Sequence, residues 1–250
     1  MQRRPELSLV FPVFDEQENV GPLLASALAL GRRLGRSFEI VVVDDGSRDA
    51  SARRIAAACA RHPEITSLHH ASNCGYGAAL RTGLRAARGA LVFFSDADLQ
   101  FDLAELTDLL AHTESFDVVA GVRAPRRDPW GRRVLAWGWG TLVNALFDLR
   151  VRDIDCAFKL FRREVLDAIP IASLGAFVNT EILVRARAAG FRIRQVPVTH
   201  RPRRAGRAKG ANPRVIVRAL VELATLYSEL RAASRGAAAE RALPARTSAP

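Results

Sequence analysis

The chain has 250 residues, 49% of them hydrophobic and 25% charged, with three cysteines and a net charge of +11 at neutral pH. This composition argues against a disordered, collagen-like or disulfide-rich chain and is typical of a globular protein with one sizeable core. No stretch reaches the about 18 consecutive apolar residues of a spanning helix, and residues 1–20 lack the apolar segment of a signal peptide. We therefore expect a cytoplasmic protein whose positive charge attracts anionic partners.

Strands and helices are predicted to alternate along the first half of the chain. Apolar, β-branched runs predict strands at residues 7–13, 38–44, 65–70, 90–95 and 117–121. Amphipathic segments between them predict helices at residues 18–34, 50–61, 77–88 and 103–112. This alternation predicts a mostly parallel, doubly wound α/β sheet. A further predicted strand, at residues 191–198, lies in a less regular α+β half.

An Arg-rich loop at residues 125–133 is followed by an apolar segment, residues 134–147, that is too short to span a bilayer. Trp130, Trp137 and Trp139 lie in or beside this segment. Tryptophan favours membrane interfaces, but the pattern fits a buried core helix equally well. Both interpretations stay open at this point.

A final amphipathic helix is predicted to begin at Asn212 and Pro213, with Asn as the N-cap and Pro at the first helical position. Its apolar face could dock on the domain, dimerise or lie on a membrane. The residues after it are rich in Ala, Arg, Ser and Pro and lack an apolar face. We therefore divide the chain into a catalytic domain at residues 1–211, an amphipathic helix at 212–231 and a disordered tail at 232–250.

Two acidic pairs each follow a predicted strand. Asp44 and Asp45 end the second strand, and Asp96 and Asp98 follow the fourth. In an open α/β sheet, ligands bind beyond the carboxyl ends of the strands, so both pairs should face one crevice. Asp49 is the better cap for the helix near residue 50, which leaves the earlier pair for a ligand.

Asp96, Asp98 and Gln100 form an Asp-x-Asp-x-Gln pattern of hard oxygen ligands. Such ligands suit Mg²⁺ or Mn²⁺, which usually keep several waters and take further ligands from a substrate diphosphate. An isolated Asp-x-Asp is weak evidence for a metal site, and the neighbouring motifs are what strengthen it here.

Four segments, at residues 12–19, 43–47, 73–79 and 96–100, occur in a characteristic order. In this the chain resembles the inverting glycosyltransferases of family 2, which have the GT-A fold, and within them most resembles the dolichol-phosphate-mannose-synthase-like branch. Segments at 121–123, 155–161 and 206–209 extend the resemblance over residues 7–210. The resemblance implies transfer of a hexose from a nucleotide-diphosphate sugar, of GDP-mannose or UDP-glucose type, to a polyprenyl or dolichyl phosphate. It also implies a protein peripheral to the cytoplasmic face of the cell membrane.

The resemblance also implies roles for individual residues. Those expected to bind the donor nucleotide are Pro12, Phe14, Glu16, Asp44, Asp45, Asn73, Gly75 and Asp96. The metal would be held by Asp96, Asp98 and Gln100. The expected catalytic residues are Asp96, Asp98, Arg123 and Lys209, and the candidate binders of an acceptor phosphate are Arg123, Lys159, Arg201, Arg203 and Lys209. Glu181 is the candidate base if the acceptor is a hydroxyl.

Other functions stay open. The acceptor could be a hydroxyl of a glycan or lipid, or the protein could bind nucleotide sugars or nucleic acid without catalysis. No nucleic-acid module is recognisable, so nucleic acid is not expected as a partner. Gly75 and Gly77 resemble a dinucleotide fingerprint, but Leu80 occupies the position of its third glycine. A homo-oligomer or an integral-membrane partner is also left open.

Overall fold

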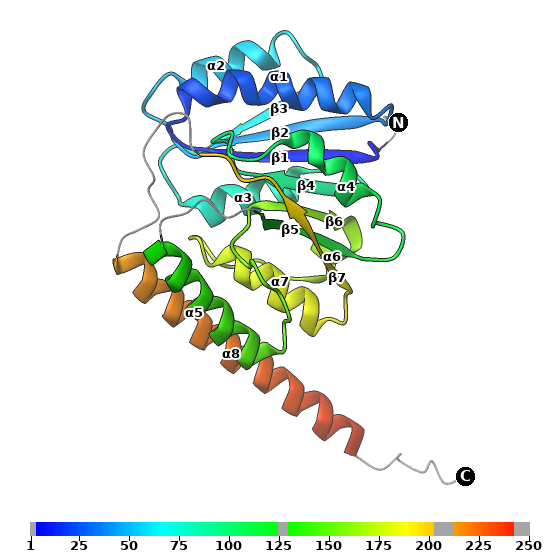
Figure 1. The fold of residues 1–250 in the computed structure, drawn as a ribbon, viewed down its shortest axis with the longest axis vertical. Coiled ribbons are helices and arrows are strands. Elements are labelled where there is room, and N and C mark those ends of the chain that lie inside the picture. Colours follow the sequence, from blue (N-terminus) through cyan, green and yellow to red (C-terminus); the bar gives the residue numbers. More distant parts are fainter. Residues whose placement is uncertain (1–3, 125–129, 203–212, 243–250) are drawn as a thin grey trace, which may run out of the picture.

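The computed structural model describes residues 4–124, 130–202 and 213–242. Its described residues form a seven-stranded sheet with the order β3-β2-β1-β4-β6-β5-β7 (Figure 1). The strands are β1 Leu7–Val13, β2 Phe38–Asp44, β3 Ile65–His69, β4 Leu91–Ser95, β5 Val118–Arg123, β6 Phe158–Arg162 and β7 Ile193–Val198. The helices are α1 Gln17–Arg33, α2 Ser51–Cys59, α3 Tyr76–Ala86, η1 Leu103–Glu105, α4 Leu106–Leu110, α5 Trp130–Phe147, α6 Arg163–Ala168, α7 Val178–Ala188 and α8 Pro213–Ala242.

The first four strands are parallel and form the doubly wound half that the sequence predicts. The predictions at residues 7–13 and 38–44 are confirmed to the residue, because strands buried on both faces are continuous apolar runs. After β3 the chain returns to place β4 on the other side of β1. Right-handed crossovers therefore put α1 and α2 on one face and α3 on the other, as Figure 1 shows. The junction of β1 and β4 is the topological switch point, where ligands bind in such sheets.

The second half of the sheet is mixed. Strand β6 runs antiparallel to both β4 and β5, and β7 is parallel to β5 at the edge. Cross-strand rings join the halves: Phe93 and Phe158 meet edge to face at 4.7 Å, and Phe94 stacks on Phe161 at 5.9 Å. Such pairs each add about 0.5–1.5 kcal/mol beyond the burial of their area. The two halves therefore share one core.

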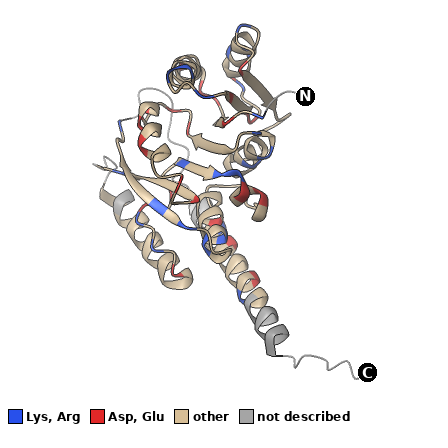
Figure 2. Cartoon of the chain, turned by 90° about the vertical axis from the view of Figure 1, so that its right-hand side faces the viewer, with Lys and Arg blue, Asp and Glu red and all other residues tan. Residues whose placement is uncertain are grey.

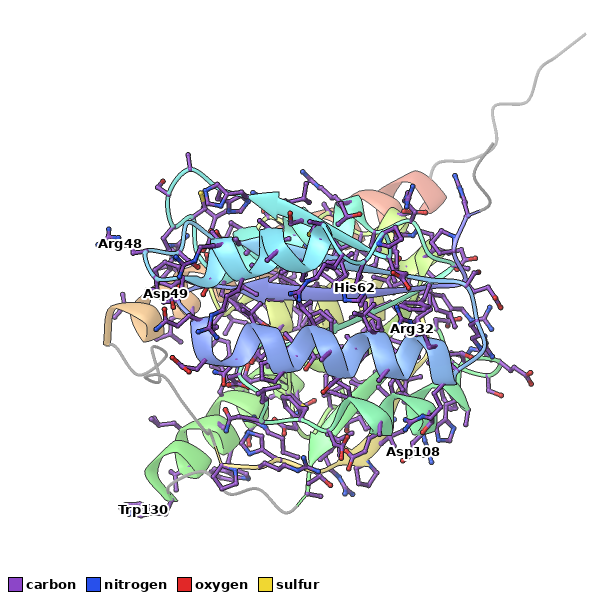
Figure 3. The ribbon with its side chains drawn as sticks, turned by 90° about the horizontal axis from the view of Figure 1, so that it is seen from above. Arg32, Arg48, Asp49, His62, Asp108 and Trp130 are labelled. Carbon is purple, nitrogen blue, oxygen red and sulfur yellow. The ribbon has the colours of Figure 1, made fainter. Side chains whose placement is uncertain are left out.

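Helices α5 and α8 lie side by side below the sheet, where Phe147 meets Tyr227 with ring centroids 5.8 Å apart (Figure 1). The core interpretation of the tryptophan segment holds for Trp139 but not for Trp130 and Trp137, and the membrane-interface interpretation stays a prediction. Trp139 donates a hydrogen bond from Nε1 to Thr180 Oγ1 at 3.2 Å, whereas Trp130 and Trp137 are 80% and 73% exposed. Trp130 projects from the first turn of α5 at the periphery of the molecule (Figure 3). One face of α5 thus packs on α7 and the other faces solvent.

The end of α8 corrects a prediction. The helix continues to Ala242, so residues 232–242 of the expected disordered tail are helical. Alanine, arginine and glutamate have high helix propensity, and a helix that extends beyond the domain needs no apolar face there. In the part of α8 that Figure 2 colours, acidic and basic residues are spread along the helix. Among the described residues, no helix has the length and apolarity needed to cross a bilayer.

Candidate functional site

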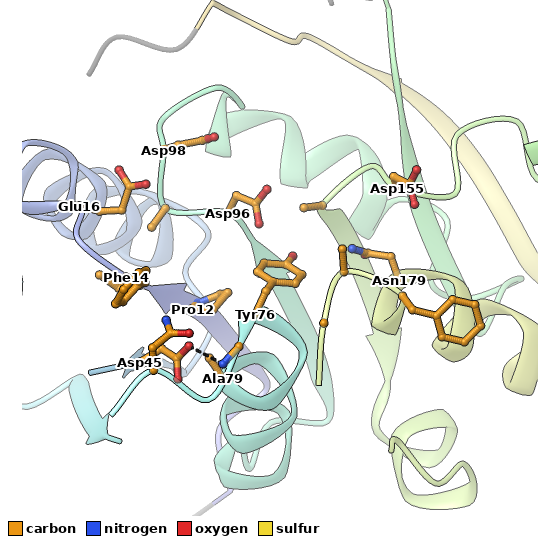
Figure 4. A pocket seen from close by; sticks show the side chains of 18 of the residues that line it. Pro12, Phe14, Glu16, Asp45, Tyr76, Ala79, Asp96, Asp98, Asp155 and Asn179 are labelled. Carbon is orange, nitrogen blue, oxygen red and sulfur yellow. Dashed lines mark hydrogen bonds between the residues drawn. The ribbon is translucent and has the colours of Figure 1, made fainter. Parts of the chain in front are cut away.

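A cavity of about 600 Å³ lies at the switch point, beyond the carboxyl ends of β1 and β4 (Figure 4). Of the residues predicted to bind the donor, it is lined by Pro12, Phe14, Glu16, Asp45, Asn73, Gly75 and Asp96. Asp98 lines it as well. The opposite wall comes from residues 175–179, Asp155 and α8. The structure therefore brings Asp45 of the first acidic pair together with Asp96 and Asp98 of the second, whereas Asp44, which was also expected to face this crevice, does not line it.

Asp45 organises the loop that leads into α3. Its Oδ1 accepts a hydrogen bond from the Cys74 amide at 2.9 Å, and its Oδ2 accepts one from the Gly75 amide, also at 2.9 Å. His70 Nδ1 lies 2.7 Å from Asp45 Oδ1. The carboxylate is therefore fixed by three partners at the edge of the cavity, and replacing it would release the loop as well as remove a charge.

The glycines of this loop allow two backbone segments to touch. Gly75 has φ of +102°, and a Cβ there would lie 2.5 Å from the Leu174 carbonyl oxygen. A Cβ on Gly77 would lie 2.6 Å from the carbonyl oxygens of Ser173 and Gly175. Gly77 therefore serves the packing of α3 against residues 173–175, whereas Gly75 also lines the cavity.

Asp96 and Asp98 converge on the cavity from the turn after β4 (Figure 4). Leu99 is held in the left-handed region with φ of +60°, and Asp98 Oδ1 accepts the amide of Gln100 at 3.1 Å. Non-glycine residues rarely adopt such a conformation, and it recurs where a turn must present ligands. Among the described residues, the buried Asp96 Oδ1 makes no hydrogen bond of normal geometry, although the Tyr76 hydroxyl points toward that carboxylate.

The chemistry of this pair fits a hard divalent cation. Burial, reinforced by the negative charge of Asp98, raises the pKa of Asp96 to about 7. Two converging carboxylates that repel each other are stabilised by a cation between them, and oxygen ligands of this kind suit Mg²⁺ or Mn²⁺. Asp96 and Asp98 are therefore the residues that would hold the ion.

The position of Gln100 disagrees with its predicted role as a metal ligand. Its side-chain Nε2 donates a hydrogen bond to the Arg201 carbonyl oxygen at 3.0 Å. The backbone carbonyl oxygen of Gln100 accepts a hydrogen bond from the Arg201 amide at 2.7 Å. The side chain does not line the cavity. The tight turn at Leu99 sends it toward the segment after β7, a long-range contact that spacing along the chain does not reveal.

Asp44 is also corrected as a donor contact. Its Oδ2 lies 2.7 Å from His69 Nδ1, its Oδ1 accepts the Ser47 amide at 3.1 Å, and it does not line the cavity. Consecutive side chains at the end of a strand point to opposite sides. Only one of the two adjacent aspartates can therefore face the crevice, and that one is Asp45.

The cations expected to bind an acceptor phosphate are mostly engaged elsewhere. Lys159 is fully buried on β6, where its Nζ donates to the carbonyl oxygens of Ile154 and Cys156 and to Asn179 Oδ1, and burial lowers the pKa of the lysine. Arg123 forms a two-pronged ion pair with Asp153 at 2.7 and 2.8 Å. Neither lines the cavity.

The remaining candidates for binding an acceptor phosphate are Arg201, Arg203 and Lys209. Arg201 is paired with Asp102 at 2.7 Å, away from the cavity. Arg203 and Lys209, the latter an expected catalytic residue, lie outside the described residues. Among the described residues, none of the predicted phosphate binders therefore reaches the cavity.

Glu181 is not placed to act as a base. Its carboxylate is buried and accepts hydrogen bonds from the amides of Ala172 and Ser173 and from Arg185 Nε. It holds the loop before α7 and does not line the cavity. A carboxylate that does line the cavity is that of Asp155, within the segment 155–161.

Three further lining residues, Arg218, Ala219 and Glu222, come from α8. The sequence pattern predicts this helix, at residues 212–231, as a segment separate from the catalytic domain. Its amphipathic pattern indicates which face packs, but nothing in that pattern indicates which part of the domain the helix covers.

We expect the stability of the metal-free protein to depend on Asp96. Because the pKa of Asp96 rises from its ordinary 3.8 to about 7, the folded state keeps a proton that the unfolded state has lost. The contribution of Asp96 to the free energy of unfolding therefore falls as pH rises from about 4 to about 7. The measurement is the melting temperature against pH, in chelator, for wild type and Asp96→Asn. The difference between the curves should change across that range, and parallel curves would contradict the assignment.

Comparison with known proteins agrees with this geometry. Residues 8–169 match glycosyl transferase family 2. Among similar solved structures is a glucosyl-3-phosphoglycerate synthase from Mycobacterium tuberculosis, 22% identical, with a TM-score of 0.66, over 91% of this chain and 76% of that one. Another is a mycobacterial protein, 25% identical, with a TM-score of 0.67, over 87% of this chain and 74% of that one. The chain belongs to glycosyl transferase family 2 and is a glycosyltransferase with the GT-A fold.

Proposed function

We propose that the protein is an inverting hexosyltransferase that uses a divalent cation and a nucleotide-diphosphate sugar, and that its acceptor is a polyprenyl phosphate. The observation that carries the donor side is the convergence of Asp96 and Asp98 in a cavity at the switch point of the sheet. Structures of the similar glucosyl-3-phosphoglycerate synthase were solved with UDP and Mn²⁺ or Mg²⁺, which supports the same pairing in this fold. The bound ion supplies Lewis-acid neutralisation of the leaving diphosphate.

The residues of this chain orient the donor. Asp45 holds the loop amides of Cys74 and Gly75 in place beside the cavity, while Pro12 and Phe14 provide an apolar wall for a base. A nucleotide sugar of GDP-mannose or UDP-glucose type that is bound in this way has its diphosphate near Asp96 and Asp98. Fixing the donor in this way reduces the entropic cost of attack by the acceptor.

The acceptor proposal rests on the surface beside the cavity. Helix α8 lines the cavity with Ala219 and exposes Val217, Leu220 and Val221 in the same turns. The neighbouring α5 exposes Trp137 in addition. Apolar surface next to a polar cavity suits an acceptor with a phosphate head and an isoprenoid tail. A phosphate is already anionic at neutral pH and needs no strong base, in agreement with the position of Glu181 away from the cavity.

A second candidate acceptor is a water-soluble phosphorylated acid. The similar synthase structures were solved with phosphoglyceric acid or glucosyl-3-phosphoglycerate. Both candidates carry a phosphate group, and they differ in the apolar tail.

The test is transfer of radiolabelled sugar with three acceptors: a polyprenyl phosphate, the matched polyprenol and 3-phosphoglycerate. We expect the label in the organic extract with the polyprenyl phosphate alone. Transfer only to 3-phosphoglycerate would replace the polyprenyl acceptor with the soluble one. Transfer only to the alcohol would overturn the phosphate acceptor and make Asp155 the candidate base.

We also propose that the protein binds peripherally to the cytoplasmic face of the cell membrane through α5 and α8. Trp130, Trp137 and Val217 are all more than half exposed, and the chain carries a net charge of +11. Co-sedimentation with vesicles should rise with the fraction of anionic lipid and fall with salt, because exposed charges are screened. Trp137→Ala should weaken it. Equal sedimentation with neutral and anionic vesicles, or none at low salt, would contradict this.

Cys74 provides a footprint for the nucleotide. Its side chain is exposed between two residues that line the cavity, whereas Cys156 is buried, and burial together with the charge of Asp153 raises the pKa of the Cys156 thiol to about 12. At neutral pH, iodoacetamide should modify Cys74 and spare Cys156. UDP or GDP with Mg²⁺ should slow the reaction at Cys74, measured by peptide mass spectrometry with Cys74→Ser as the control. Unchanged labelling at saturating UDP and GDP would place the nucleotide elsewhere.

A further inference from the structure

The cavity contains far more negative than positive charge. Its described lining includes six acidic residues and one basic residue, Arg218. The acidic residues are Glu16, Asp45, Asp96, Asp98, Asp155 and Glu222. A divalent cation at Asp96 and Asp98 offsets the charge on the donor side. An anionic acceptor entering from the other side needs a second cation, because burying an unpaired phosphate beside carboxylates is strongly unfavourable.

Arg218 is held at the acceptor side by its own helix. Its Nε donates to Glu222 Oε1 at 3.2 Å, one helical turn further along α8. The Arg218 side chain is 54% exposed and that of Glu222 is 22% exposed. Within the described residues the two terminal nitrogens of Arg218 make no hydrogen bond to protein, so the outer edge of the guanidinium is available to a ligand.

We infer that Arg218, oriented by Glu222, binds the phosphate of the acceptor, an inference that rests on the proposed function. A guanidinium presents a planar fork of donors that matches phosphate oxygens. The sequence did not single out Arg218, and the cations that it does predict for this role are engaged elsewhere among the described residues. Lys159 donates to buried carbonyl oxygens, Arg123 pairs with Asp153 and Arg201 pairs with Asp102. Helix α8 also lies outside residues 8–169, so this subsite belongs to the part of the chain beyond the family match.

The same helix offers an exposed apolar surface on which the tail of a lipid acceptor could lie. Val217 and Val221 flank Arg218 in the helix and are each 61% exposed, while Leu220 is 46% exposed. A phosphate monoester held at Arg218 can therefore extend its tail along this face, outside the cavity. The recognised chemistry is the phosphate monoester, which a lipid or a soluble acid could supply.

The experiment measures KM for farnesyl phosphate and for 3-phosphoglycerate at saturating donor. Arg218→Gln should raise KM for the accepted phosphate about tenfold while KM for the donor stays unchanged. Arg231→Gln is the control: it removes the same charge from the same helix at a position that does not line the cavity. It should change neither the KM for the phosphate acceptor nor the KM for the donor. Glu222→Gln keeps a side-chain oxygen that can accept the hydrogen bond from Arg218 Nε and removes a negative charge beside the phosphate, so it should lower the acceptor KM.

The outcomes separate a ligand contact from a structural ion pair. If Arg218→Gln behaves like Arg231→Gln, the inference is overturned. If Arg218→Gln and Glu222→Gln raise the acceptor KM equally and lower the melting temperature equally, the pair is structural and the inference is also overturned. The farnesyl phosphate and 3-phosphoglycerate arms show which source supplies the phosphate.

A failure of the proposed function is distinguishable from a failure of this inference. If the wild type transfers sugar to neither phosphate, the proposed acceptor is wrong, and calorimetry of farnesyl phosphate binding in the presence of UDP and Mg²⁺ decides the subsite. Binding to wild type that Arg218→Gln abolishes supports the subsite. No binding to wild type, or equal binding to both proteins, overturns it.

Discussion

Replacing Asp98 with asparagine is expected to reduce sugar transfer by roughly 10²-fold or more, the loss typical when one group that stabilises transition-state charge is removed. The substitution keeps the size of the side chain, and its amide oxygen can still accept the Gln100 amide. It removes the negative charge that would hold a divalent cation against the leaving diphosphate. The measurement is the initial rate of radiolabelled sugar transfer at saturating Mg²⁺.

Gln100→Ala is the matched control for this prediction. Gln100 belongs to the same motif, but its side chain donates a hydrogen bond to the Arg201 carbonyl oxygen and does not line the cavity. It should therefore retain most of the activity. Melting temperatures near that of wild type would show that both variants are folded. Turnover at the wild-type rate in Asp98→Asn, or undiminished turnover in chelator, would refute the role of the carboxylate.

Replacing Lys159 with methionine is expected to lower the free energy of unfolding by about 3 kcal/mol or more, since each buried acceptor left without a donor costs about 1–3 kcal/mol. The acceptors are the carbonyl oxygens of Ile154 and Cys156 and the side chain of Asn179. Urea denaturation monitored by circular dichroism measures the change. Arg150→Met, which breaks the exposed ion pair with Asp148, is the control and should have little effect.

The same variant distinguishes two roles for Lys159. A variant as stable as wild type but with a raised KM for the acceptor would restore the sequence-based expectation that this lysine binds phosphate. A destabilised variant whose remaining folded fraction keeps the acceptor KM would agree with the buried contacts.

The sequence predicts the first half of the sheet well because the necessary information is local. Strands β1 and β2 are apolar runs buried on both faces, and turn residues bound them. The prediction missed β6, which carries Lys159 between Phe158 and Leu160. A charged residue in a fully buried strand is stabilised only by acceptors from distant segments, and their approach is not visible in the local pattern.

The candidate site also has one part that the local sequence predicts and another that it does not. Asp45, Asp96 and Asp98 follow strand ends, and the topology of a doubly wound sheet brings strand ends together. The wall of the cavity formed by Asp155 and α8 depends on how these segments approach the crevice, which is decided by tertiary packing. Glu181 illustrates the limit: a carboxylate early in a helix can serve a ligand or a neighbouring loop, and here it binds the amides of residues 172 and 173.

The most direct test of the donor site is a crystal structure of the protein with Mn²⁺ and either UDP or GDP, with the metal located by anomalous scattering. We expect one strong anomalous peak within coordination distance of the Asp96 and Asp98 carboxylates and of the diphosphate, with the base near Pro12 and Phe14. A nucleotide bound in the cavity without metal at these carboxylates would contradict it. So would a metal and diphosphate bound together at another place in the molecule.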